Sequence, residues 1–556
     1  MAKRRKVLFI QLPQLDNDLK GEHENVPLAA AYLQYASEMA GEDAHYEFIQ
    51  LPPDSHDYDN AALLDLITAM APPIIACTLY LWNIERTLRL MEAVRTRLPA
   101  VRILLGGPEA AYTHPFLYQR PVADAIVVGE GENIFPDLLR AFRTGCRINF
   151  ATVSLKTRTG YRWGKKTPPP VSLSHQLPPP GYDACRPDTK GMAYLETSRG
   201  CPMRCTYCRY PHLRRSMSFL EPDEILARVR ALRRLGAREI RIVDPSFNSH
   251  PQFMEIILRL AALNRSGTLS FFAELNAERL TDAEADELAR ARFVEIEVGM
   301  QSRSPEVLKA IRRPTSLPRL EAGIRRLTKR KIKVTLDIMY GLPLQDSGDV
   351  RRSVAWALKL PRTNVQCLQT LLLPGTELRE RHQEWNLHAG SRPPYPVTMT
   401  STMDSTAFRR VESMISRHPK LRSDVPTQIF AGTKLELFPE PGSKPGTIRR
   451  AYLFKGPDLY ARRQAIGRVI RDVMKQEPDG LFQFVLCPLQ EEPLDLLDHV
   501  IAVIRKQPRH LLDRYAAVAL DDKIASRRLL ILLPKGRKLS KDWIKASEQI
   551  LSNTFF

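Results

Sequence analysis

Three cysteines lie within eight residues of the chain, and their spacing indicates metal chemistry. They are Cys201, Cys205 and Cys208, in the run Ser198-Arg-Gly-Cys-Pro-Met-Arg-Cys-Thr-Tyr-Cys-Arg209. The other five cysteines show no metal-ligand spacing, so the motif offers three thiolates and no fourth. A structural zinc site needs four protein ligands, whereas an iron–sulfur cubane held by three cysteines keeps one iron open for another molecule. The spacing therefore predicts a reactive cluster; a zinc knuckle that includes His212, or three unrelated thiols, is the alternative.

The residues after the cysteines alternate between strand-like and helix-like segments. Strands are expected at 193–197, 239–243, 270–275, 294–299, 333–340 and 364–371, and helices at 221–235, 251–265, 281–291, 304–311, 318–330 and 346–359. Regular β/α alternation predicts a parallel sheet covered by helices. Six repeats fit a partial (β/α)6 barrel, in which functional residues lie at the carboxyl ends of the strands.

Polar residues stand at those strand ends. They are Asp244, Ser246 and Asn248 after the second strand, Glu274 at the end of the third, Gln301 after the fourth and Asp337 in the fifth. Carboxylates and amides can bind the amino, hydroxyl and purine groups of a cofactor through hydrogen bonds. Each residue alone could be a satisfied polar group at a barrel rim, and the ordered series is more specific than its members.

Together these motifs resemble the radical S-adenosylmethionine (SAM) superfamily. The resemblance implies a [4Fe-4S] cluster on the three cysteines, whose open iron chelates the amino and carboxylate groups of SAM so that one electron can cleave its sulfonium. It also implies that Tyr207 contacts the adenine and that Glu274 acts in catalysis with the cysteines. The other implied SAM contacts are Asp244, Ser246 and Asn248 at the amino group, Glu274 and Gln301 at the ribose or the cluster, and Asp337.

The amino-terminal part shows a second β/α alternation. Strands are expected at 6–12, 46–51, 73–80, 102–106 and 123–128, and helices at 28–40, 60–70, 84–98 and 133–143. This pattern predicts a doubly wound parallel sheet with ligands at the carboxyl ends of its strands. The loops there read Leu-Tyr-Leu-Trp-Asn at 79–83, Leu-Gly-Gly-Pro-Glu-Ala at 105–110 and Val-Gly-Glu-Gly-Glu at 128–132. Their glycines permit close approach of the backbone to a ligand.

These loops, placed ahead of the cysteine motif, resemble the cobalamin-binding domain that precedes many radical SAM barrels. The implied cobalamin contacts are Pro27, Leu28, Tyr80, Leu81, Trp82, Asn83, Gly106, Gly107, Glu109, Gly129, Glu130, Gly131 and Glu132. Many cobalamin proteins carry Asp-x-His-x-x-Gly after the first strand, but residues 11–18 contain no histidine and His23 is misplaced. The resemblance therefore implies base-off cobalamin without a protein imidazole on cobalt; a flavodoxin-like domain without a cofactor is the alternative.

Proline-rich runs divide the chain. Pro168–Pro170 and Pro178–Pro180 flank a segment that is unsuited to a helix or a central strand, so we expect a linker at 146–190. The remaining boundaries are a cobalamin-binding-like domain at 1–145, a partial barrel at 191–390 and a C-terminal domain of unclear function at 391–556. In that last part, strands near 428–437, 481–486 and 528–533 alternate with helices near 459–476, 493–506 and 539–551. The fold class is therefore α/β throughout, with a small C-terminal α/β domain.

The net charge of +20 is unevenly distributed: residues 1–150 carry −5, residues 151–400 carry +16 and residues 401–556 carry +9. Basic runs at 209–215 and 325–333 could meet the phosphates of a nucleic acid, but solvated arginine-rich helix faces are the simpler interpretation. No apolar stretch reaches the roughly 18 residues of a membrane span, and the amino terminus lacks the apolar region of a signal peptide. Unpatterned cysteines favour a reducing compartment, so we expect a cytoplasmic protein.

The combined resemblance implies a cobalamin-dependent radical SAM methyltransferase acting at an unactivated carbon or phosphorus centre. Its partners would be a small-molecule or peptide substrate and an external electron donor such as flavodoxin or ferredoxin. Two alternatives remain: radical cyclisation or rearrangement by the same domain pair, and an iron–sulfur protein that binds nucleic acid without catalysis. Methylthiolation is disfavoured, because those enzymes carry three further cysteines in their first domain and here only Cys77 and Cys146 occur.

Overall fold

The structure is a computed structural model. It describes residues 4–13, 26–52, 55, 60–182, 185–188, 190–210, 216–391, 393–418 and 421–423, and beyond these residues 450–456, 463–476, 482–488, 496, 499, 502–503 and 529–531. The described residues form two compact units: 26–48 and 104–423 belong to the first, and 5–13, 49–103 and those beyond 423 belong to the second. In these ranges no helix is both long and apolar enough to cross a membrane.

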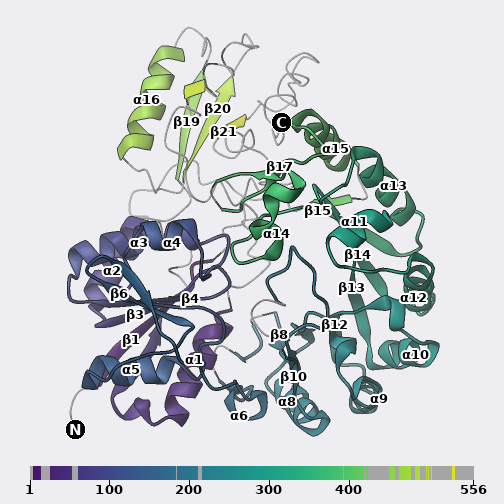
Figure 1. Cartoon of the computed structure of the whole chain (residues 1–556), viewed down its shortest axis with the longest axis horizontal. Coiled ribbons are helices and arrows are strands. Elements are labelled where there is room, and N and C mark those ends of the chain that lie inside the picture. The colour runs from purple at the N-terminus through teal and green to yellow at the C-terminus, as the bar shows by residue number, and fades with distance from the viewer. Residues whose placement is uncertain are drawn as a thin grey trace. The chain divides into compact units, whose positions relative to one another are not determined.

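The first sheet has seven strands in the order β2-β1-β3-β4-β5-β6-β7. Their bounds are β1 Arg5–Ile10, β2 Tyr46–Gln50, β3 Ile74–Thr78, β4 Arg102–Gly106, β5 Ala125–Val127, β6 Val153–Thr157 and β7 Gly160–Trp163. β1 pairs with β3 and β4 with β5 in parallel, as expected. An order of 2-1-3-4-5 is that of a doubly wound sheet, which binds ligands where the strand order reverses. The helices of this part are α1 Leu28–Met39, α2 Asn60–Met70, α3 Ile84–Arg97, α4 Pro115–Gln119 and α5 Phe135–Thr144 (Figure 1).

The segment expected to be a linker contains regular structure. β6 and β7 form an antiparallel hairpin that extends the first sheet beyond β5, and α6 spans Leu173–Gln176. The prolines themselves lie outside the strands, as their missing N–H groups require. The first sheet therefore continues past residue 145 to Trp163, and the proline runs that led us to expect a linker begin only after this hairpin.

The second sheet is parallel throughout, in the order β18-β15-β14-β13-β12-β11-β8. Its strands are β8 Met192–Leu195, β11 Glu239–Ile242, β12 Ser270–Glu274, β13 Phe293–Gln301, β14 Lys333–Tyr340, β15 Thr363–Gln369 and β18 Leu421–Ser423. The six expected strands are confirmed, with β14 at the expected bounds. β18 was not expected; it comes from the segment after residue 390 and pairs with β15.

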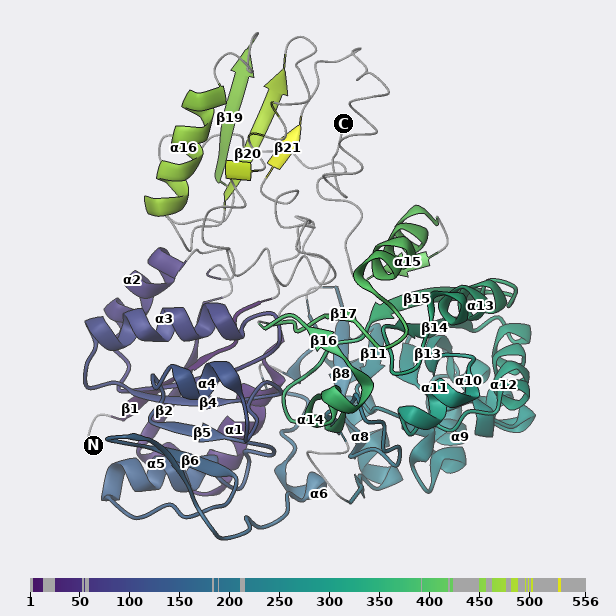
Figure 2. The ribbon, with the colours of Figure 1, turned by 45° about the horizontal axis from the view of Figure 1, so that its top comes forward.

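Helices cover the outer face of this sheet, as Figures 1 and 2 show for α9, α10, α12 and α13. Their bounds are α8 Pro222–Arg234, α9 Phe253–Leu263, α10 Asp282–Ala291, α11 Pro305–Ala310, α12 Leu317–Lys329, α13 Ser347–Ala357, α14 Glu377–Glu380 and α15 Ser405–Arg417. Capping boxes begin α10 at Thr281 and α13 at Asp346, so the sequence itself marks these starts. Two short hairpins complete this part: β9 Ser198–Arg199 with β10 Ser218–Phe219, and β16 His388–Ala389 with β17 Val397–Met399.

The described residues near the carboxyl terminus form a parallel sheet of β19 Arg450–Gly456, β20 Phe482–Pro488 and β21 Leu529–Ile531, with α16 at Arg463–Gln476. The expected strands near 481–486 and 528–533 and the helix near 459–476 are confirmed, whereas β19 was not expected. The expected strand at 428–437 and helix at 539–551 lie outside the described residues, as does most of the expected helix at 493–506. An α/β arrangement therefore holds for this part as well.

Candidate active site

The loop with the three cysteines follows β8, the edge strand of the second sheet, and lies between β9 and β10. Gly200 starts this loop with φ +103°, where a Cβ would lie 3.1 Å from the Ser216 carbonyl oxygen. The Thr206 N–H donates to the Ile311 carbonyl (3.1 Å), and the Thr206 carbonyl accepts from the Leu378 N–H (2.9 Å). The loop is therefore anchored to two other parts of the barrel before any cofactor is considered.

The thiols of the loop are shielded to different degrees. Cys205 is buried, and Cys201 and Cys208 are half-buried. Burial raises the pKa of the Cys201 thiol. Burial also raises the pKa of the Cys208 thiol to about 11, although a hydrogen bond with the backbone of Tyr210 acts in the opposite direction. Iron binding must therefore displace protons from these thiols, since only thiolates are metal ligands.

A guanidinium faces the loop. Arg313 Nη1 donates to Cys205 Sγ at 3.6 Å, and Nη2 donates to the Gly299 carbonyl at 2.7 Å. A Cβ at position 299 would lie 2.7 Å from that same Nη2, so glycine there leaves room for Arg313. A cation beside buried thiolates lowers the free energy of their charged form. The sequence analysis did not identify Arg313, whose only signal in the sequence is that it is a basic residue shortly after helix α11.

The described residues contain no group of three or more His, Cys, Asp or Glu side chains that converge as ligands of one metal ion. A cubane cluster differs from a mononuclear site, because each of its cysteines binds a different iron atom. Three thiols on one anchored loop, with a buried guanidinium beside them, are a donor set that fits such a cluster.

Carboxylates lie side by side across three neighbouring strands. Glu274 on β12 pairs in register with Glu297 on β13, and Asp337 on β14 pairs with Gly299 on β13. Burial, followed by the neighbouring Glu297, raises the pKa of Asp337 above its usual range. Among the described residues, Asp337 Oδ1 is buried without a hydrogen-bond partner. The Gln301 Oε1 atom is buried in the same condition. Unpaired buried acceptors are costly, and an amino group or hydroxyls of SAM would satisfy them.

The residues after β11 hold neighbouring strand ends together. Asp244 is fully buried and accepts from the Thr197 N–H (2.8 Å) and the Ser198 hydroxyl (2.7 Å). Asn248 bonds both backbone groups of Asn276 at 2.9 Å, and its Oδ1 accepts from Ser246 at 3.3 Å. We expected Asp244 and Asn248 at the SAM amino group. The hydrogen bonds that the structure shows for them are all made to other protein groups. They would act on SAM through the loops that they position.

Tyr207 is half-buried, between Cys205 and Cys208 in sequence. It packs against an apolar cluster of Val307, Leu308, Ile311, Met339 and Leu342. Burial raises its pKa, so its hydroxyl stays protonated at neutral pH. Packing against this apolar cluster determines on which side of the cysteine loop the Tyr207 ring lies. The expected contact of Tyr207 with adenine stays a prediction.

The loop after β3 is organised by Asn83. Its Oδ1 accepts from the Tyr80 N–H (2.8 Å), and its Nδ2 donates to the Leu12 carbonyl (3.0 Å) and the Thr78 carbonyl (3.2 Å). The rings of Tyr80 and Trp82 stack with centroids 4.3 Å apart. The result is a stiff loop with a flat aromatic pair beside Leu81, of the kind that suits a large planar ligand.

The loop after β4 contains Gly107 with φ +100°, a conformation that favours glycine. Two residues later, Glu109 is buried and lies 3.2 Å from His114 Nε2. The same nitrogen is 3.2 Å from the Tyr395 hydroxyl, and His114 Nδ1 accepts from the Leu117 N–H. Both nitrogens of His114 are therefore engaged within the protein, and Glu109 is committed to this histidine.

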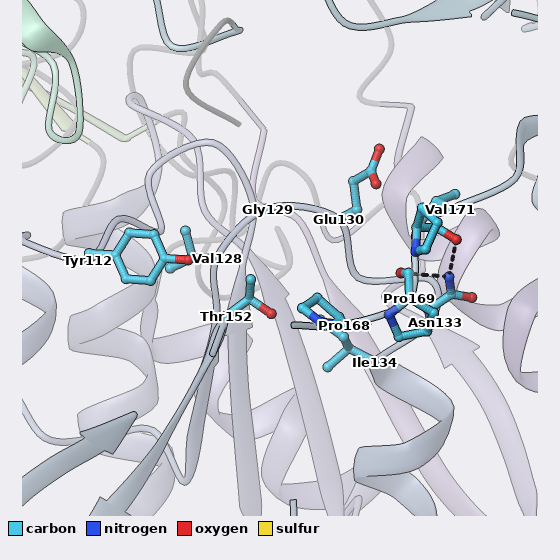
Figure 3. Close-up of a pocket in the computed structure, with 11 residues that line it drawn as sticks. Tyr112, Val128, Gly129, Glu130, Asn133, Ile134, Thr152, Pro168, Pro169 and Val171 are labelled. Atoms are coloured by element: carbon cyan, nitrogen blue, oxygen red, sulfur yellow. Dashed lines mark hydrogen bonds between the residues drawn. The ribbon is translucent and has the colours of Figure 1, made fainter. Parts of the chain in front are cut away.

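The loop after β5 lines a cavity of about 150 Å³. Figure 3 shows Gly129, Glu130 and Asn133 on one side and Tyr112, Thr152 and Pro168 around the rest. Gly129 has φ +87°, a conformation that favours glycine, and a Cβ at Gly131 would lie 2.8 Å from Leu33 Cδ2 of α1, so a larger residue there would have to displace that side chain. Pro27 and Leu28 stand at the start of that helix. The cavity lies beside the glycines that we expected to meet cobalamin.

The basic segments are mostly paired. Arg325 bonds Glu321, and Arg326 and Arg330 bond Asp282. Arg209 is buried rather than presented to solvent. Its guanidinium is used inside the protein, which corrects the suggestion that Arg209 meets phosphates; residues 211–215 of the same basic segment lie outside the described residues.

Glu274 predicts a pH effect on stability. Burial, then the neighbouring Glu297, raises its pKa to about 7 from 4.5, although part of the residue remains exposed to water. The folded protein therefore binds this proton more tightly than the unfolded chain, and the stabilisation is lost as the pH rises from 4.5 through about 7. In cluster-free protein, Glu274→Gln should lose less free energy of unfolding over this interval, as measured by urea denaturation at several pH values.

Asp244 titrates in the same window, with a pKa raised to about 6 by burial, so wild type and variant must be compared directly. Glu255→Gln, on α9 and paired with Arg259, is the control. After reconstitution, Glu274→Gln should also raise the dissociation constant for SAM. In free-energy terms this loss of binding should exceed the change in the free energy of unfolding. An unchanged pH profile together with unchanged SAM affinity would contradict the placement of Glu274 at the site.

Comparisons with known proteins agree with these two regions. Residues 195–357 match the model of the radical SAM superfamily, and residues 19–139 match the model of the B12 binding domain. The chain is 25% identical over 390 residues to the cobalamin-dependent radical SAM methyltransferase TokK of Streptomyces tokunonensis, covering 64% of this chain and 54% of that protein. It is 24% identical over 383 residues to 2-(S-pantetheinyl)-carbapenam-3-carboxylate methyltransferase of Streptantibioticus cattleyicolor, covering 64% of this chain and 53% of that one. It thus spans about half the length of these curated relatives.

Among solved structures, the radical SAM methyltransferase TsrM of Kitasatospora setae, with cobalamin and a [4Fe-4S] cluster bound, superposes with a TM-score of 0.56. The match covers 72% of this chain and 80% of that one at 18% sequence identity. At this identity the likeness establishes the fold. It agrees with the parallel sheets described above.

Proposed function

We propose that this chain, which carries a B12 binding domain ahead of a radical SAM domain, is a cobalamin-dependent radical SAM methyltransferase acting on an unactivated carbon or phosphorus atom. The observation that carries the proposal is the anchored three-thiol loop at the end of β8, beside the unpaired acceptors of Asp337 and Gln301. Further support comes from relatives that are named as methyltransferases.

The residues of the barrel would divide the work as follows. Cys201, Cys205 and Cys208 would hold the cluster, and Arg313 would offset the charge that their thiolates bring into a buried site. Asp337 and Gln301 would accept hydrogen bonds from SAM. When bound, the cluster supplies the electron that cleaves SAM, and cobalamin supplies a carrier for the methyl group.

For cobalamin, we propose base-off binding at the loops 79–83, 105–110 and 128–132. The expectation of no protein imidazole on cobalt is supported by His114, the histidine nearest the glycines of the second loop in sequence, whose nitrogens bond Glu109, Tyr395 and the Leu117 N–H. A small-molecule or peptide substrate and an external flavodoxin or ferredoxin complete the proposal.

The proposal is tested by anaerobic reconstitution with iron, sulfide and cob(II)alamin, followed by turnover of SAM that carries a deuterated methyl group. With a reductant that takes cob(II)alamin to cob(I)alamin and also reduces the cluster, we expect S-adenosylhomocysteine and a labelled methyl group on the corrinoid even without the acceptor substrate, together with 5′-deoxyadenosine. The electron paramagnetic resonance spectrum of the bound cob(II)alamin should lack nitrogen superhyperfine splitting.

Formation of 5′-deoxyadenosine without S-adenosylhomocysteine or labelled corrinoid would instead favour cyclisation or rearrangement. Absence of bound corrinoid would contradict the cobalamin assignment, and nitrogen splitting would contradict base-off binding without imidazole.

A further inference from the structure

Two arginines bracket the three cysteines, and the first of them reaches the loop after β5. Arg199 stands two residues before Cys201. Its Nη1 lies 2.7 Å from Glu132 and 3.3 Å from Glu130, and its Nε and Nη2 bond Glu196 at 2.8 and 2.9 Å. Its side chain is only 14% exposed. One guanidinium therefore joins the strand that leads into the cysteine loop to the glycine-rich loop that lines the cavity of Figure 3.

The second arginine reaches the loop after β4. Arg209 follows Cys208 directly and is buried. Its Nη2 donates to the Ala110 carbonyl at 2.8 Å, and its Nη1 donates to the Pro374 carbonyl. Gly375 has φ +76°, and a Cβ there would lie 3.0 Å from Nη1, so the loop after β15 is shaped around this side chain.

These contacts have an energetic consequence. A buried guanidinium with several charged or carbonyl acceptors is held in one geometry, because losing any partner leaves an uncompensated charge in a dry environment. A planar fork of donors also fixes the relative orientation of the segments it joins, which an ammonium does not do. The two ends of the cysteine loop are thus tied to two of the three loops expected to meet cobalamin. Ordering one loop lowers the entropic cost of ordering the other.

We propose that Arg199 and Arg209 are positioning residues that couple cobalamin binding to assembly of the iron–sulfur cluster. The inference rests on the proposed cobalamin and cluster sites. A cluster on Cys201, Cys205 and Cys208 fixes the loop between the two arginines, and the arginines then hold the loops 105–110 and 128–132 in the conformation that binds the corrinoid. Thermodynamic linkage requires that the effect be reciprocal, so bound cobalamin should equally favour retention of the cluster.

The coupling is measured as the ratio of two dissociation constants for hydroxocobalamin, one before and one after anaerobic cluster reconstitution. For wild type we expect cobalamin to bind about tenfold more tightly once the cluster is present, within the usual range of coupling between sites. In Arg199→Gln this ratio should fall towards one, with the brown cluster still formed. Arg199→Lys, which keeps the charge and loses the fork, should give an intermediate ratio. Arg209→Gln should also lower the ratio.

Arg228→Gln is the matched control. Arg228 is 13% exposed, bonds Glu224 and the carbonyls of Leu177 and Pro178, and touches none of these loops. Its ratio should equal that of wild type. If Arg199→Gln fails to fold, Glu132→Gln removes the same contact from the other side and should lower the ratio likewise.

A wild-type ratio near one, or an unchanged ratio in Arg199→Gln, would overturn this inference and leave the proposed function intact. Failure of wild type to bind hydroxocobalamin at all would overturn the cobalamin assignment, and the coupling with it.

Discussion

Replacing Cys201, Cys205 and Cys208 together by alanine is expected to abolish both the brown chromophore and all reductive cleavage of SAM. These three cysteines are the only ones that the motif offers as cluster ligands. No other cysteine of the sequence stands at a spacing that could replace them. The loop stays anchored through the backbone of Thr206, so thermal stability of the cluster-free protein should change little. Iron and sulfide content and formation of 5′-deoxyadenosine are the measurements.

The matched control replaces Cys77, Cys185 and Cys367, which lie outside the motif. That variant should still form the cluster if it folds, as judged by circular dichroism. Reductive SAM cleavage by the variant without Cys201, Cys205 and Cys208 would show that the cluster assignment is wrong.

Arg313→Gln should have the second largest effect. Arg313 is a buried cation in electrostatic contact with Cys205, Glu274 and Asp337, and removing it leaves the thiolates of a bound cluster without this compensating charge. Breaking buried charge pairs typically costs about 3–5 kcal/mol of stability, which corresponds to at least about 100-fold in an equilibrium constant. We expect the affinity for the cluster to fall by about that factor, so that the cluster is lost much faster to an iron chelator and reductive cleavage of SAM falls with it.

Arg313→Lys keeps the charge and should retain part of both properties. Arg303→Gln is the control, since Arg303 lies over the Trp356 ring, 5.6 Å from its centroid. Equal chelator resistance and equal SAM cleavage in Arg313→Gln would assign Arg313 to the scaffold alone.

The regular elements were largely predictable, because their signals are local. Strand β14 is a buried apolar run with a helical segment before and after it in the sequence. The capping box at Asp346 marks the start of the following helix, α13. The cysteine motif is local too, since all three ligands lie within one loop. Such features depend on residues that are neighbours in the chain, so their spacing can be read without knowing the fold.

Short and irregular elements were not predictable. β18 has three residues, too few to show a period of two, and it joins the sheet only because β15 offers an open edge. β6 and β7 fell within the segment expected to be a linker because of the two proline runs that follow them at 168–170 and 178–180. Their existence depends on pairing with β5, which is a property of the assembled sheet.

The residue types at the strand ends were foreseen from the sequence, but their partners were not. Asp244 accepts hydrogen bonds from Thr197 and Ser198, because parallel strands bring residues 46 and 47 positions apart into contact, and its expected SAM contact stays a prediction. Arg313 meets Cys205 across 108 residues, and Arg199 meets Glu130 across 69. The sequence alone predicts the longer elements and the three-cysteine motif, since both follow from local spacing. Which charges share a site depends on strand register and loop packing, and these exist only once the sheets have assembled.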